Sequence, residues 1–101
     1  MFDPATFTEA FEREHGATEA EWLGQLPGAV GAHPLSLSGQ QALVTLGDGE
    51  LRLSWAVLPP RRIALITLPR LQVAYRFRGV PHAERVTFLR YFDLFMQKGG
   101  G

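Results

Sequence analysis

The sequence predicts an α+β fold, with a four- to five-stranded antiparallel meander, N-terminal helices, and a C-terminal helix packed on one face of the sheet. Two patterns support this prediction. Runs of alternating apolar and polar residues, joined by short turns rich in glycine and proline, fill the chain from residue 35 to residue 78. Apolar residues at helical spacing occur near both ends. The 101 residues are predicted to form a single domain, residues 1–101.

The first helix is predicted from a start pattern and an apolar stripe. Asp3-Pro4 has the form of an N-cap followed by proline at the first helical position. Phe7 and Phe11 then recur four residues apart, on one side of a helix. These patterns predict a helix from about Pro4 to Glu14.

A second, short helix is predicted to follow. Thr18 and Glu21 have the spacing of a capping box, in which the two residues satisfy each other's backbone N–H groups. The helix is expected to end at Pro27-Gly28, because proline interrupts a helix. Residues 1–27 are therefore predicted to be a helical segment.

Three strands are predicted next. Leu35 to Ser38 alternates apolar and polar residues, Ala42 to Leu46 forms a second run, and Leu51 to Val57 alternates again. Gly47-Asp48-Gly49 is the clearest hairpin turn in the chain. Strands joined by such short turns form an antiparallel meander.

The segment from Leu58 to Arg78 is predicted to complete the sheet. Ile63 to Leu68 is apolar on both faces, which is typical of a central strand. Leu68-Pro69-Arg70 is predicted to be the turn that joins it to an antiparallel neighbour, and Pro59-Pro60 is predicted to close its other end. In the neighbour, residues 71–78, apolar and basic residues alternate.

The last helix is predicted to run from His82 to Gln97. Its apolar side chains extend further around the helix than one sheet face requires, and Tyr91, Leu94 and Phe95 are therefore candidate contacts to a partner. A flexible glycine tail, residues 99–101, is predicted to follow.

Charge is divided unevenly along the chain. Up to residue 50 there are eight acidic residues and one basic residue, whereas the rest of the chain has nine basic and two acidic residues. This division is compatible with nucleic-acid binding, and also with docking of one half on the other. The candidate phosphate contacts are Arg61, Arg62, Arg70, Arg76 and Arg78. Alternation places Tyr75 and Phe77, possible stacking groups for bases, on the opposite side from Arg76 and Arg78.

The sequence contains no recognisable catalytic or metal-binding pattern. The absence of cysteine excludes disulfides and thiolate metal sites. His15, His33 and His82 lie far apart, and we expect them to be exposed or to cap helices. Asp93 lies within the aromatic helix, where a buried carboxylate would need an arginine of the sheet as its partner. No phosphate-binding loop, dinucleotide motif or nucleophile elbow occurs, so we expect no enzymatic activity, cofactor or metal.

No run of about 18 apolar residues is present. We therefore expect a cytoplasmic protein that does not bind membranes.

A resemblance to known proteins is carried by the C-terminal half, in the segments LPPRRIALITLPRLQVAYRF and ERVTFLRYFDLFMQKGGG. These segments resemble a group of small uncharacterised bacterial proteins, mainly proteobacterial, that end in a Pro-Arg-Arg strand, an aromatic helix and a glycine-rich end. The group has no known activity, so the resemblance assigns a function to no residue. It implies only that the glycine end belongs to the natural protein.

Together these features predict a non-enzymatic protein-interaction module that self-associates, as a homodimer or larger homo-oligomer, or that binds another protein. The alternative is a nucleic-acid-binding protein that uses the basic face of the C-terminal half. The first requires association in solution, and the second requires binding that weakens steeply with salt.

Overall fold

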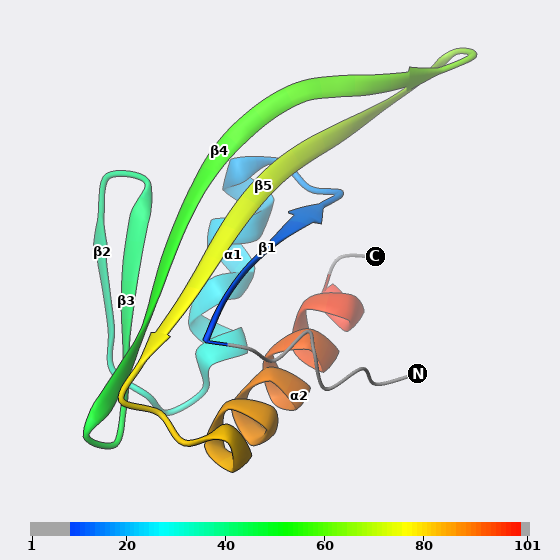
Figure 1. Ribbon diagram of the computed structural model, residues 1–101. Helices are drawn as coiled ribbons and strands as arrows, with labels where there is room; N and C mark the ends of the chain where they lie inside the picture. The colour runs from blue at the N-terminus through cyan, green and yellow to red at the C-terminus, as the bar shows by residue number, and fades with distance from the viewer. Residues whose placement is uncertain (1–8, 100–101) are drawn as a thin grey trace.

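The computed structural model describes residues 9–99 and shows a five-stranded antiparallel sheet with two helices on one of its faces (Figure 1). In chain order the elements are β1 (Ala10–His15), α1 (Glu19–Val30), β2 (Leu35–Ser38), β3 (Gln41–Leu46), β4 (Gly49–Ile63), β5 (Ile66–Arg78) and α2 (His82–Gly99). The strands lie in the order β1-β5-β4-β3-β2. The predicted α+β fold is confirmed, because β2 to β5 form an antiparallel meander and α2 follows it.

The core lies between the sheet and the helices. In β3, in the first half of β4 and in the second half of β5, every second side chain is buried, as expected of a sheet with one covered face. The helices cover this face with Trp22 and Leu26 of α1 and with Leu89 and Phe92 of α2, all of them buried. Burial of each such side chain contributes roughly 1.5–3 kcal/mol, so this contact is the main source of stability.

Helix α1 begins as predicted but ends later. The Thr18 hydroxyl accepts from the Glu21 backbone N–H at 3.1 Å, and the Glu21 carboxylate accepts from the Thr18 N–H at 2.9 Å, which confirms the capping box. The predicted end at Pro27 is wrong, because the helix continues to Val30. Proline removes only one backbone donor here, and burial of Ala29 and Val30 offsets that loss.

Residues 10–15 form a strand, β1, so the helix predicted from Pro4 to Glu14 is wrong over this part. The earlier part of that helix lies outside the described residues. β1 pairs antiparallel with residues 71–76 of β5 and supplies hydrogen-bond partners to an edge that would otherwise be open. Pairing between distant segments outweighs a weak helical pattern. Residues 1–27 are therefore not helical throughout.

β4 and β5 form one long hairpin, and the turn predicted at Leu68-Pro69-Arg70 is wrong. The chain turns instead at Ala64-Leu65, between the paired residues Ile63 and Ile66. The hairpin extends well beyond the rest of the sheet (Figure 1). Residues 63–68, at the turn end of this hairpin, were predicted to form a central strand, whereas they are the outermost part of the sheet.

The prolines of this hairpin lie inside strands and do not end them. Pro59-Pro60 coincides with a shift of register between Leu58 and Arg61 in β4. Such an irregularity tolerates proline, because residues there need not donate a ladder hydrogen bond. Pro69 likewise lies within β5, beyond the reach of β1.

The predicted last helix is confirmed. α2 begins at His82 and continues to Gly99, two residues beyond the predicted end at Gln97. Gly99 was predicted to belong to the flexible tail, and residues 100–101 lie outside the described residues.

Candidate functional site

Residues 56–70 form a two-stranded projection, hereafter the arm (Figure 1). β3 accompanies β4 only as far as Ser54, and β1 accompanies β5 only from Leu71 onward. Beyond these points β4 and β5 pair only with each other, up to Ile63 opposite Ile66. Among the described residues, the arm therefore has no paired strand on either of its outer edges.

The arm exposes apolar side chains. Its large exposed apolar residues are Val57, Ile63, Leu65, Ile66 and Leu68. Leu65, at the turn, is 102% exposed, so it is fully available to a partner. An isolated two-stranded ribbon is marginally stable in water, and soluble monomers rarely expose contiguous apolar patches. The arm therefore has the character of a contact surface.

The edges of the arm are poorly suited to the addition of another strand. Pro59, Pro60 and Pro69 have no N–H to donate to a new neighbour. Arg61 and Arg62 are exposed and add charge near the tip. Proline and charge on an edge strand are common protection against strand addition. A partner is therefore expected to contact the side chains of the arm and not its backbone.

The base of the arm is tied to β1. Arg70 Nη2 donates to Glu14 Oε1 at 2.8 Å, and Arg70 Nη1 donates to the Pro59 carbonyl oxygen at 3.2 Å. Arg61 Nη2 lies 4.0 Å from Glu14 Oε2. The hydrogen bond from Arg70 lowers the pKa of the Glu14 carboxyl, so this carboxylate is ionised at neutral pH. These contacts fix the direction in which the arm leaves the sheet.

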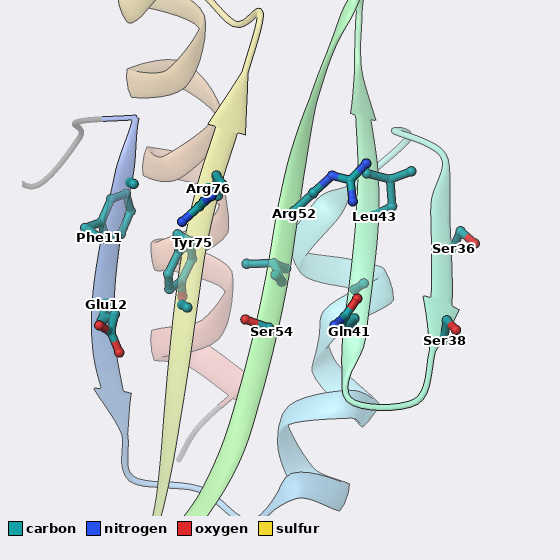
Figure 2. A pocket seen from close by; sticks show the side chains of 14 residues that line it. Phe11, Glu12, Ser36, Ser38, Gln41, Leu43, Arg52, Ser54, Tyr75 and Arg76 are labelled. Carbon is teal, nitrogen blue, oxygen red and sulfur yellow. The ribbon is translucent and has the colours of Figure 1, made fainter.

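The face of the sheet opposite the helices carries an open hollow of about 650 Å³ (Figure 2). Arg52 of β4 and Arg76 of β5 are direct neighbours across the two strands and both project from this face. Glu12 of β1 and Gln41 of β3 also line the hollow, and the short side chain of Ser54 between them leaves space above the sheet. No histidine is among its lining residues in the described chain, so its serines lack the usual general base.

The five candidate phosphate contacts are not brought together. Three lie on the arm and two in the body of β5: Arg61, Arg62 and Arg70, then Arg76 and Arg78. Acidic β1 lies beside basic β5, where Glu14 binds Arg70 and the Glu12 carboxylate accepts from the Gln72 amide at 2.6 Å. The acidic and basic halves thus dock on each other in part. Tyr75 and Phe77 are buried on the face opposite Arg76, as alternation predicts.

The candidate partner contacts on α2 differ in exposure. Tyr91 and Leu94 are 53% and 54% exposed. Phe95 instead packs inward, because its ring covers Gly28 of α1 so closely that a Cβ at Gly28 would lie 2.8 Å from Phe95 Cε1. Tyr91 and Leu94 offer apolar surface to a partner, whereas Phe95 joins the two helices.

A second hollow of about 580 Å³, hereafter the end pocket, lies between the end of α1 and the start of α2. Its floor consists of the buried side chains of Val30, Leu46 and Phe88. Glu84 and Tyr91 of α2 stand at its rim and are exposed. The end pocket therefore offers a mainly apolar floor with one acidic group beside it.

β1 brings a polar cluster against the core. His15 Nε2 lies 2.9 Å from the Tyr75 hydroxyl, so the expectation that this histidine is exposed or caps a helix is wrong. The Arg13 guanidinium pairs with the Asp93 carboxylate, as expected for a partner from the sheet. Phe11 stacks on Tyr75 with ring centroids 4.7 Å apart. The cluster fastens β1 to both the sheet and α2.

Acidification is expected to destabilise the protein through His15. Burial, and then the nearby Arg13 guanidinium, lower the pKa of His15 from its ordinary 6.5. The unfolded chain therefore binds this proton more readily than the folded chain, and the free energy of unfolding falls as the pH drops below about 6.5. His15→Gln keeps a nitrogen that can donate to the Tyr75 hydroxyl and should flatten this dependence. Denaturant unfolding between about pH 7.5 and pH 5.5 measures it, and equal slopes in both proteins would contradict the expectation.

The described residues offer no other obvious chemistry. Within residues 9–99, no three side chains of the metal-binding types come close enough together to hold an ion. Neither helix in that range combines the length and the apolar character needed to cross a membrane.

No protein-family model matches the chain, and no curated protein matches it significantly. The resemblance to small bacterial proteins with a glycine-rich end stays a prediction.

Proposed function

We propose that the protein is a non-enzymatic, cytoplasmic interaction module that self-associates, and that the arm is its contact element. The observation that carries this proposal is the full exposure of Leu65 at the tip of an apolar projection. Burial of one such side chain contributes roughly 1.5–3 kcal/mol, so several together favour association. Because Glu14 and Arg70 already hold the base of the arm, less ordering is needed on binding.

Replacing both Leu65 and Ile66 by serine is expected to abolish self-association. These side chains are 102% and 59% exposed, so their loss should change the stability of the monomer little. Sedimentation from low to high micromolar concentration measures the mass. The wild-type chain should gain mass with concentration, whereas the double variant should remain monomeric.

The matched control is Leu37→Ser, which removes an exposed leucine on β2, away from the arm. This control should associate like the wild-type chain. A wild-type chain that stays monomeric at high micromolar concentration would contradict self-association, and a control that behaves like the arm variant would contradict the role of the arm.

Nucleic-acid binding is the second proposal. It is favoured by Arg76 and Arg78, whose side chains are exposed and make no ion pair or side-chain hydrogen bond within residues 9–99. Glu12 on the adjacent strand weighs against it, because this residue pairs with Ala74, two positions from Arg76, and so places negative charge near that arginine. Oligonucleotide binding that collapses between about 50 and 200 mM salt would favour this second proposal.

A further inference from the structure

We infer that the arm of one molecule binds in the end pocket of a second copy, and that two copies exchange arms in this way to form a twofold dimer. This inference rests on the proposed self-association through the arm.

The tip of the arm and the end pocket complement each other in shape and polarity. The tip is convex and presents Leu65 between the exposed side chains of Ile63 and Ile66. The end pocket is concave, with a floor of buried apolar side chains. Its volume of about 580 Å³ lies in the range of sites that enclose apolar ligands.

Charge complements the same pairing. Arg62 directly precedes Ile63 at the tip, and its side chain is exposed and makes no ion pair or side-chain hydrogen bond within residues 9–99. Glu84 at the rim of the end pocket is also exposed, and its carboxylate makes no ion pair within residues 9–99. A tip that enters the end pocket would bring these opposite charges together, and a partner lacking a basic group beside its apolar tip would not satisfy Glu84.

The positions of the two features explain why the partner is a second copy. The tip lies at one end of the molecule, whereas the end of α1 and the start of α2 lie at the other (Figure 1). One molecule therefore does not fill its own end pocket. Two copies placed side by side and antiparallel give two identical tip-to-pocket contacts, which is a closed isologous arrangement. Tyr91 at the rim and Leu94 one turn further along α2 would then flank the incoming arm.

Cross-linking between two single-cysteine variants tests the contact directly. The chain contains no cysteine, so Leu65→Cys and Thr87→Cys each carry one thiol. Thr87 is exposed at the end pocket. The matched control, Ala20→Cys, is an exposed helical position near the other end of α1, about 15 Å along that helix from the pocket. The two variants are mixed with a short bis-maleimide, and only products containing one chain of each kind are counted.

We expect the 65–87 product to exceed the 65–20 product at least tenfold. Equal or absent 65–87 cross-linking in chains that still self-associate through Leu65 would overturn this inference and leave the proposed function standing. A chain that remains monomeric at high micromolar concentration would overturn both. Polymers larger than a dimer would overturn the reciprocal twofold arrangement.

A charge exchange tests the partner of Arg62 independently. Arg62→Glu and Glu84→Arg should each weaken the dimer roughly threefold or more, and the double variant should regain most of the loss. Both positions are exposed, so the folding of these variants is not at risk. Independent, additive losses in the double variant would show that these two side chains do not meet.

Discussion

Gly49→Ala is expected to lower the free energy of unfolding by roughly 3 kcal/mol, a large fraction of the stability of a domain of this size. A Cβ at Gly49, at the start of β4, would lie 2.6 Å from the Arg78 carbonyl oxygen and would also collide with the carbonyl oxygen of Gly79. Both atoms belong to the backbone, so no side-chain rotation relieves the clash. The strands would have to separate where the β3–β4 turn meets the end of β5.

Thermal unfolding measures this effect, and a loss of roughly 3 kcal/mol corresponds to a fall in Tm of roughly 12 to 24 °C for a chain of this length. The control is Gly24→Ala, on the exposed side of α1, where an added Cβ meets nothing within 4 Å. That change should stabilise the protein by roughly 1 kcal/mol, because alanine favours the helix. If Gly49→Ala leaves Tm unchanged, the two backbone segments are not in fixed contact.

The parts of the fold that sequence patterns predicted correctly are those set by short-range chemistry. The capping box at Thr18 and Glu21 depends on residues three apart. The hairpin turn at Gly47-Asp48-Gly49 depends on adjacent residues, and Gly47 there adopts a φ of 61° that favours glycine. The α2 helix follows from apolar spacing within one segment.

β1 could not be predicted in this way, because what makes it a strand lies some 60 residues away. Its pairing depends on the open edge of β5 and on contacts such as Glu14 with Arg70. Phe11, Arg13 and His15 are the residues of β1 that face the core. Because two of these three are polar, the sequence does not show the apolar–polar alternation that is typical of a strand with one buried face. These two polar side chains can face inward because each has a partner there: His15 contacts the Tyr75 hydroxyl, and Arg13 pairs with Asp93.

The arm was mispredicted for a different reason, which bears on its proposed role. A run that is apolar on both faces indicates a buried central strand only if the chain obeys the usual burial rule. Residues 63–68 break that rule by leaving their apolar side chains in solvent. Positions where a sequence departs from the burial rule are expected at functional surfaces. The prolines at 59, 60 and 69 were the available sign, since they suit unpaired edges better than turns in this hairpin.

The candidate contacts on α2 were identified from excess apolar character, and two of the three are exposed. Spacing along the sequence could not show that Tyr91 and Leu94 are exposed whereas Phe95 packs inward, because a helical wheel does not show where a second helix approaches. The close contact between Phe95 and Gly28 shows that this side of α2 faces α1.

Asp93→Ala is expected to lower the free energy of unfolding by about 2 kcal/mol. The change leaves the Arg13 guanidinium without its carboxylate while it remains over the Phe11 ring, 5.0 Å from the ring centroid. The expected loss is smaller than the roughly 3–5 kcal/mol of a fully buried pair. The reason is that the side chains of Arg13 and Asp93 keep 23% and 37% of their exposure, so water compensates part of the charge.

A double-mutant cycle in denaturant isolates the pair, with Arg13→Ala as the second change. Arg13→Ala should cost more than Asp93→Ala, because it also removes the guanidinium from the Phe11 and Tyr75 rings. The double variant should be more stable than the sum of the two losses predicts, by about 1 kcal/mol. Strict additivity would mean that packing of the arginine stem, and not the ion pair, fastens β1 to α2. Since Glu14 on the same strand holds the base of the arm, loss of this attachment should also weaken self-association.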